Sequence, residues 1–333
     1  MFVSIIGLFL LKKRAIVDIE AGSNRLYSQG NVRQMENLKI FQKRKECKVM
    51  VYEKISGFSD EIDSMIDVQF EVLATLGMKY FEVRGVDGKN ISRLEDAELQ
   101  QLKEKMDRSG IKVSSIGSPI GKIKLDAPFE PHFEVFKKVV ATAKTLGAQY
   151  IRVFSFYHDG GDVWTAEERE VVVARLREMI AYAKEQGVVL LHENEKDIYG
   201  DTADRCADLM KDLYCDNFKV VFDPANFVQC EQDTKYAYGL LKDYIAYMHI
   251  KDALFDGGKV VPAGLGDGNV PYILEDLFKN GYDGFLSLEP HLGNFAGLAE
   301  LELDDAMLDL PDGGAGTFTL AHRALCGILS KFM

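Results

Sequence analysis

The sequence lacks paired cysteines. Its five cysteines are odd in number, lie scattered through 333 residues and form no CxxC pair. Disulfide frameworks and zinc ribbons both need cysteines paired at characteristic spacings. The pattern argues against both. We therefore expect free thiols in a reducing compartment and predict a cytoplasmic protein.

An excess of positive charge is also absent. The chain has 40 Lys and Arg against 52 Asp and Glu, a net charge of −12, and no basic cluster beside the residues singled out below. Proteins bind phosphate backbones through arrays of Lys and Arg, so we expect no nucleic-acid partner. A chain of this length with 47% hydrophobic residues suits one large α/β domain.

Long hydrophobic runs are missing as well. The apolar run FVSIIGLFL at 2–10 is too short to span a bilayer as a helix. Basic residues follow this run instead of preceding it, unlike in a secretory signal. We predict that residues 1–49 are an N-terminal extension outside the fold, that 50–333 form the domain, and that no membrane is a partner. A membrane-associating N-terminal helix is the alternative.

From residue 50 onward, short β-rich stretches alternate with amphipathic stretches of helical periodicity. The predicted strands are 52–57, 79–85, 111–116, 149–155, 188–193, 218–223, 245–251 and 284–289. The predicted helices are 62–76, 95–109, 130–146, 166–186, 202–213, 233–243, 270–280 and 316–331. Thr165 with Glu168 three residues later predicts a capping box at the start of one helix.

The alternation predicts a closed barrel. Eight strand–helix units in about 280 residues match the size of a (β/α)₈ TIM barrel. An open doubly wound sheet, the alternative, usually has a glycine-rich phosphate loop after its first strand, and none occurs here. The glycines of GLGDGN at 264–269 follow the seventh predicted strand and could form a turn or a phosphate site. We predict a single-domain α/β TIM barrel.

Four consecutive predicted strands end in residues of metal-binding type. The fifth to eighth strands carry Glu193, Asp223, His249 and Glu289 in turn. TIM-barrel enzymes place functional residues at the carboxyl ends of strands, so these four side chains should meet at one mouth. Charged groups are costly to bury unpaired, and a divalent cation would offset them together. Three carboxylates and one imidazole favour Mn²⁺, Mg²⁺ or Co²⁺ over Zn²⁺, and we predict one ion, Mn²⁺ first.

Other polar residues near the strand ends are candidates for substrate binding. For several of them an ordinary structural role, such as a strand-end salt bridge or a solvated loop histidine, is the alternative. The candidates are Glu82, Arg84, Arg152, His158, Glu195, Asn226, Lys251 and His291.

Around these residues the sequence resembles the xylose-isomerase-like barrels known as sugar phosphate isomerases/epimerases. The resemblance covers about residues 52–330 and includes FSDEI, FEVRG, ENEKDIYGDT, FDPANF, HIKDA, GLGDG and LEPH. It implies that the four strand-end residues bind one divalent ion. As in the ketose 3-epimerases, it also implies that Glu193 and Glu289 remove and return the substrate proton. Many members have histidines where this chain has Glu195 and Asn226, which leaves the substrate and the reaction open.

The predicted chemistry is proton abstraction next to a carbonyl. The ion would stabilise an enediolate while Glu193 and Glu289 act as base and acid. We therefore predict a metal-dependent keto-sugar isomerase or epimerase with a small-molecule sugar substrate. Loss of a β-leaving group would instead make it a dehydratase or lyase of an inosose or 3-keto-glycoside. A non-catalytic sugar- or metal-binding barrel is a second alternative. For partners we consider a homo-oligomer or a separate partner subunit.

Overall fold

The computed structural model describes residues 52–161, 163–292 and 314–333. By its internal contacts the chain divides into two units, Met1–Val49 and Met50–Met333, and all of the described residues belong to the second. The predictions for residues 1–49, including the membrane-associating helix, lie outside the described residues.

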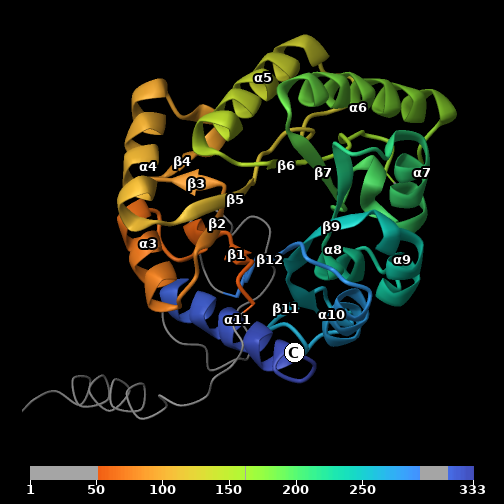
Figure 1. The fold of residues 1–333 in the computed structure, drawn as a ribbon. Helices are drawn as coiled ribbons and strands as arrows, with labels where there is room; N and C mark the ends of the chain where they lie inside the picture. Colours follow the sequence, from red (N-terminus) through yellow and green to blue (C-terminus); the bar gives the residue numbers. More distant parts are fainter. Residues whose placement is uncertain (1–51, 162, 293–313) are drawn as a thin grey trace, which may run out of the picture. The chain divides into compact units, whose positions relative to one another are not determined.

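Eight parallel strands form the barrel (Figure 1). They pair in the order β1-β12-β9-β8-β7-β6-β5-β2, and a single parallel bridge from Phe58 to Glu82 links β1 to β2. The predicted TIM barrel is confirmed. The strands are β1 (Ile55–Gly57), β2 (Tyr80–Val83), β5 (Lys112–Ile116), β6 (Tyr150–Val153), β7 (Val189–Glu193), β8 (Phe218–Phe222), β9 (Ile245–Ile250) and β12 (Phe285–Leu288).

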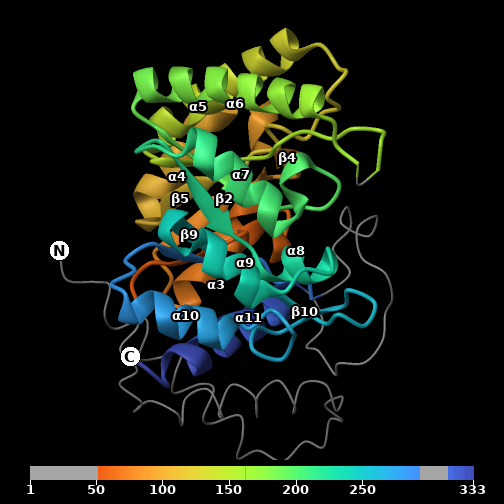
Figure 2. The same ribbon diagram turned by 90° about the vertical axis from the view of Figure 1, so that its right-hand side faces the viewer.

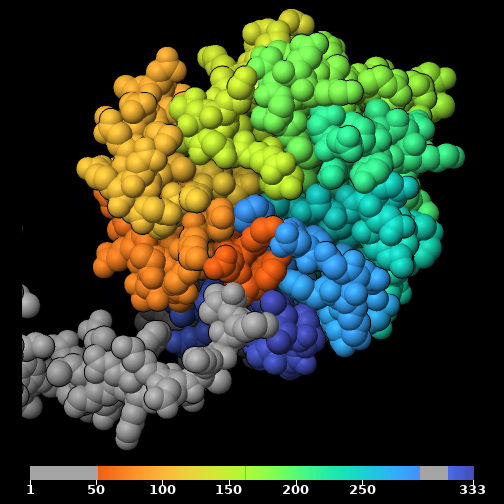
Figure 3. All heavy atoms as spheres, in the orientation of Figure 1, coloured from red at the N-terminus to blue at the C-terminus, as the bar shows by residue number. Residues whose placement is uncertain are grey.

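The first and last strands meet at the seam of the barrel. Ile55 of β1 lies opposite Leu286 of β12 in a parallel ladder. In the space-filling view, orange-red atoms from the start of the domain accordingly lie beside light-blue atoms from the later part of the barrel (Figure 3). On its other side, β1 is joined to β2 by the single bridge from Phe58 to Glu82. Glu82 therefore lies where β2 closes the ring of strands against β1.

Helices cover the outside of the strand ring (Figure 1). The predicted helices are present with bounds shifted by up to four residues. They are α3 (Ile66–Thr75), α4 (Asp96–Ser109), α5 (Phe129–Leu146), α6 (Ala166–Gln186), α7 (Ala203–Leu213), α9 (Thr234–Leu241), α10 (Val270–Lys279) and α11 (Gly314–Leu329).

Local sequence explains several helix ends. Thr165 Oγ1 accepts the backbone N–H of Glu168, and the Glu168 carboxylate accepts that of Thr165, so the predicted capping box of α6 is confirmed. α4, α5 and α6 end in left-handed glycines, which have no Cβ to oppose a positive φ. α5 and α6 lie side by side in both views, and their Phe133 and Tyr182 rings are 5.8 Å apart (Figure 1, Figure 2).

The structure also contains short elements that the sequence periodicity did not predict. The helix α8 (Pro224–Gln229) has too few residues to show a helical period, but Asp223 caps it and Pro224 opens it. Two hairpins, β3 (Gly85–Val86) with β4 (Lys89–Asn90) and β10 (Asp252–Ala253) with β11 (Val260–Val261), extend the loops after β2 and β9. The short helices η1 (Ser59–Glu61), η2 (Ile91–Arg93), η3 (Tyr199–Asp201) and η4 (Lys242–Tyr244) complete the described part.

Two apolar layers hold the domain together. The main core lies between strands and helices and contains fully buried Phe81, Phe136 and Leu176. A smaller cluster of Leu191, Val221 and Tyr247 is distinct from it. Side chains alternate between the two faces of a barrel strand, so these three residues and the strand-end residues of the same parity share the inward face. No helix in the described ranges is long and apolar enough to cross a membrane.

Candidate metal centre

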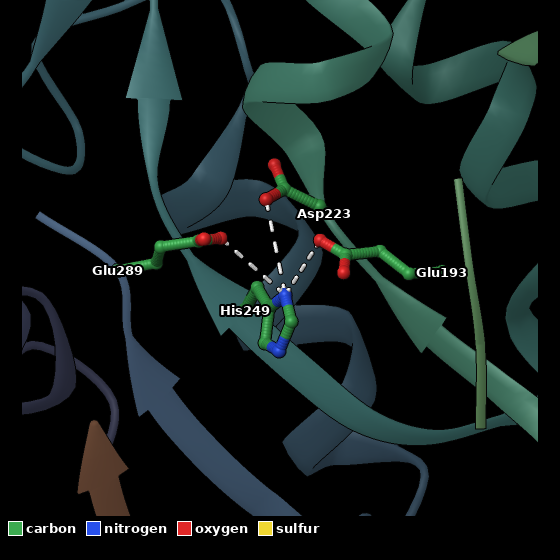
Figure 4. Close-up of side chains that lie close together, drawn as sticks. All are labelled: Glu193, Asp223, His249 and Glu289. Atoms are coloured by element: carbon green, nitrogen blue, oxygen red, sulfur yellow. Dashed lines mark hydrogen bonds and ion pairs between the residues drawn. The ribbon is translucent and has the colours of Figure 1, made fainter. Parts of the chain in front are cut away.

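The four strand-end residues meet at one mouth of the barrel. Glu193 ends β7, Asp223 follows β8, His249 lies in β9 and Glu289 follows β12. Each offers one ligand atom within 4.8 Å of the others, and all four residues are buried. The three carboxylates turn towards one ring nitrogen of His249 (Figure 4). The structure therefore brings together all four residues of the predicted metal site.

The nitrogen that faces the carboxylates is Nδ1. It lies 2.9 Å from Glu193 Oε1, 3.6 Å from Glu289 Oε2 and 3.9 Å from Asp223 Oδ2. Glu193 Oε2 and Asp223 Oδ2 are buried and accept no well-aligned hydrogen bond from the described residues, although a cationic side chain lies 3.1 Å from each. Buried acceptors without donors are costly. The donor set, three carboxylates and one imidazole, fits a single dication that would satisfy these oxygens.

Basic side chains surround the four residues. Lys251 Nζ lies 3.1 Å from Asp223 Oδ2 and 3.3 Å from Glu289 Oε2. Arg152 Nη1 lies 3.1 Å from Glu193 Oε2, and Arg84 Nη1 lies 3.4 Å from Glu289 Oε1. These cations offset part of the excess negative charge, and two of the three oxygens that face Nδ1 also face Lys251.

Burial and neighbouring charges shift the pKa values of the four residues in different directions. Burial, with Glu289 and Glu193 nearby, raises the pKa of Asp223 to about 7 against the opposing effect of Lys251. Burial alone would raise the pKa of Glu193, but His249 and Arg152 hold it at about 2. Burial acts against protonation of His249, yet Glu193 and Glu82 raise its pKa well above the usual value. The cluster retains protons that a bound dication would displace.

Two asparagines hold the backbone and side chains around Asp223. Asn194 donates to the Asp223 carbonyl at 2.9 Å and accepts the Asp223 N–H at 3.0 Å. Asn226 donates to Glu193 Oε1 at 3.3 Å and to the Asn194 carbonyl at 2.9 Å. Glu195 lies further out and pairs with Lys122 at 2.9 Å. The structure thus brings Asn226 to the predicted ligands, whereas the carboxylate of Glu195 is held by a lysine.

A second polar cluster adjoins Glu289. Arg84 contacts Asp60 and Glu61 besides Glu289. His291 Nε2 lies 3.4 Å from both Glu61 Oε1 and Glu289 Oε1. Asp60 and Glu61 were not among the predicted site residues, although they lie in η1, a few residues after the first strand. Their place in the loop after a strand was the signal that could have identified them.

Two other predicted features lie elsewhere. His158 stacks on Trp164 at 3.7 Å and faces Glu168 at 3.3 Å, at the start of α6. Within the described parts, no hydrogen bond or ion pair joins His158 to the four residues. Glu82 lies below them inside the barrel, 3.2 Å from His249 Nε2. Its carboxylate faces His249 from the side opposite the predicted metal.

The backbone N–H groups of the loop GLGDGN bind a side chain of the same chain. The Asp252 carboxylate accepts backbone N–H groups of Gly264, Gly266 and Gly268 at 2.8, 3.1 and 2.8 Å. A Cβ at Gly266 would lie 2.4 Å from that carboxylate. The amides that could have bound a phosphate therefore organise the loop around Asp252, and the turn interpretation is the one that holds.

Comparisons with known proteins agree with the barrel. The model of the xylose isomerase-like TIM barrel family matches residues 70–307. A comparison with curated proteins finds no match.

Solved structures resemble this chain at low sequence identity. The IOLI protein with a bound zinc atom has a TM-score of 0.65 and 19% identity over 84% of this chain and 99% of its own. An L-ribulose 3-epimerase has a TM-score of 0.63 and 19% identity, with 83% of this chain and 94% of its own chain covered. The probable 3-DHS dehydratase AsbF of Bacillus anthracis has a TM-score of 0.62 and 18% identity, with 82% of this chain and 98% of its own chain covered. At these identities the likeness is one of fold.

Proposed function

Because the chain belongs to the xylose isomerase-like TIM barrel family, we propose that it is a divalent-metal-dependent keto-sugar isomerase or epimerase. The observation that carries the proposal is the convergence of Glu193, Asp223, His249 and Glu289 within 4.8 Å. Four ionisable side chains buried around one point need a chemical reason, and a cation that binds substrate oxygens supplies one. The fold shared with an L-ribulose 3-epimerase supports it.

We propose that the two glutamates transfer the substrate proton from opposite sides. In the barrel, β7 and β12 are separated by β8 and β9, and Glu193 and Glu289 approach the centre from opposite directions (Figure 4). A substrate carbon between them would lose its proton to one carboxylate as the C–H electron pair shifts towards the carbonyl. The other glutamate, when protonated, would return a proton to the opposite face and invert that carbon.

The ion would stabilise negative charge developing on the substrate oxygens. This chain's own residues orient the two glutamates. Arg152 and Asn226 hold Glu193, while Arg84 and Lys251 hold Glu289. Of the candidate metals, Mn²⁺ remains our first choice on donor chemistry, with Mg²⁺, Co²⁺ and Zn²⁺ as alternatives. We also propose a cytoplasmic location, on the cysteine pattern.

The likeness of fold to a probable dehydratase supports a second candidate, a dehydratase or lyase. The same proton abstraction next to a carbonyl would then expel a β-leaving group. Incubation of the metal-loaded protein with ketoses, inososes and 3-keto-glycosides in deuterated water separates the two. Solvent deuterium at the α-carbon without loss of water or aglycone supports the isomerase or epimerase, and release of either group supports the lyase.

Substitution of Glu289 tests whether the site is catalytic. Glu289→Gln should lower kcat by about 10²–10⁴-fold, the usual contribution of a general acid or base. Glu170→Gln on the surface of α6, whose side chain is 70% exposed, should leave kcat unchanged. A wild-type protein that binds the metal and sugars but turns none of them over would contradict the proposed enzyme.

A further inference from the structure

The carboxylate of Glu82 lies inside the barrel beneath the four proposed ligands. Glu82 is 1% exposed, as deeply buried as the ligands themselves. The three ligand carboxylates face Nδ1 of His249, whereas the Glu82 carboxylate faces Nε2. A buried carboxylate that does not reach the metal position is costly to keep.

Glu82 Oε2 is held between two donors from other strands. It lies 3.2 Å from His249 Nε2 in β9, and Ser287 Oγ in β12 donates to it at 2.7 Å. Ser287 and His249 are neighbours in the β9–β12 register, so both reach the same oxygen. The contact crosses the interior of the barrel, because β2 is separated from β9 by β1 and β12.

Two aromatic side chains pack against the His249 ring. The edge-to-face contacts of Phe58 at 5.2 Å and Tyr247 at 6.0 Å lie against the ring. Neither aromatic ring determines which imidazole nitrogen has the proton. A neutral histidine binds a metal through the nitrogen without the proton, and the hydrogen bond at its other nitrogen decides which one that is.

We propose that Glu82 is a positioning residue for the metal: its carboxylate accepts the Nε2–H of His249 and so directs the Nδ1 lone pair at the point where the three ligand carboxylates meet. Ser287 orients the accepting oxygen. The inference rests on the proposed function only in requiring a metal at the four residues. It assigns Glu82 a place behind the ligand instead of beside the substrate.

The test is the affinity of the purified metal-free protein for Mn²⁺ and Co²⁺, measured by isothermal titration calorimetry. Glu82→Leu removes the acceptor and should weaken binding about 10–100-fold, the usual effect of losing such a partner. Glu82→Gln retains an amide oxygen that can accept the Nε2–H and should recover most of the affinity. Ser287→Ala should weaken binding by a smaller factor.

A matched control separates positioning from general damage. Ser56 is fully buried in the same barrel and bonds Ser114 at 2.6 Å, without a hydrogen bond to Glu82 or His249. Ser56→Ala should retain wild-type affinity even where it lowers the melting temperature as much as Ser287→Ala. A second readout is the nitrogen-15 NMR spectrum of the Zn²⁺-loaded protein, in which His249 should have its proton on Nε2.

The outcomes are distinguishable. A wild-type protein that binds none of the metals overturns the proposed metal centre itself. Wild-type binding together with unchanged affinity in Glu82→Leu overturns only the role of Glu82. If Glu82→Gln binds as weakly as Glu82→Leu, the charge matters and not the hydrogen-bond acceptor, which also overturns it. Should Glu82→Leu fail to fold, unchanged affinity in Ser287→Ala together with an Nδ1 proton on His249 would overturn it.

Discussion

At the scale of single residues, charged side chains at adjacent positions have different roles. Lys251 and Asp252 are adjacent, yet Lys251 contacts two proposed ligands and Asp252 organises the loop at 264–268. The alternation of side chains along the chain after β9 sends them to opposite sides. Residue type without direction therefore cannot assign a role.

The loop around Asp252 leads to a prediction about glycine. Gly266→Ala would place a Cβ 2.4 Å from Asp252 Oδ1 and 2.6 Å from the Ala253 carbonyl. We expect it to lower the free energy of unfolding by about 1–3 kcal/mol, the cost of overpacking, measured by urea denaturation. Gly239→Ala in α9 meets nothing within 4 Å and should be neutral or stabilising. Equal effects of the two changes would refute this reading of the loop.

His132 on α5 makes stability depend on pH. Its Nε2 accepts the Gly121 backbone N–H at 2.8 Å, and burial followed by the nearby Arg175 lowers its pKa. The unfolded chain therefore takes up a proton at this histidine at a higher pH than the folded chain, so the free energy of unfolding should fall as pH drops below about 6.5.

The matching variant is His132→Gln, whose amide oxygen can still accept the bond but does not titrate. Urea unfolding at pH 7.5 and pH 5.5 should show a smaller loss of stability in this variant than in the wild type. An identical pH dependence would rule out a contribution from His132.

At the scale of elements, the local sequence was sufficient to predict the long helices. The capping box at Thr165 begins α6 where the sequence predicts it. α8 escaped detection, because its six residues include neither two helical turns nor an amphipathic stripe. Its N-cap, Asp223, is a predicted metal ligand, and the same side chain also accepts the Asn226 N–H at 2.9 Å.

Removal of the α6 cap is a direct test of that element. Thr165→Ala deletes the oxygen that accepts the Glu168 N–H and should cost about 1 kcal/mol of stability in urea unfolding. Thr145→Ala is the matched control, because Thr145 is exposed near the end of α5 and only bonds back to the Ala141 carbonyl. Its loss should be neutral within about 0.5 kcal/mol.

At the scale of the whole molecule, a bound ion should stabilise the fold. A dication at 100 times its dissociation constant would add about 2.7 kcal/mol to the free energy of unfolding. For a domain of this size that corresponds to a rise in melting temperature of roughly 5 °C. Differential scanning fluorimetry with Mn²⁺, Mg²⁺, Co²⁺ or Zn²⁺ should show the rise, and EDTA should reverse it.

Asp223→Asn removes one ligand charge and should abolish most of that shift. A wild-type protein whose melting temperature responds to none of the four ions would count against the metal centre.

The barrel and the gathering of the four residues followed from the sequence alone. Strand periodicity, helix signals and the count of units specify a (β/α)₈ barrel, and such a barrel brings the carboxyl ends of its strands to one mouth. Glu193, Asp223, His249 and Glu289 each end a strand or lie near its end, so no long-range information was needed to bring them together.

Only the tertiary structure decided which neighbours face those four residues. Glu82 lies in β2 and Arg84 directly follows it, two residues apart, yet Glu82 lies behind His249 and Arg84 lies beside Glu289. His158 turned to the cap of α6 because its loop placed it against Trp164. Such contacts depend on the depth of a residue in the barrel and on loop paths, which arise from packing between distant segments and leave no periodic trace in the sequence.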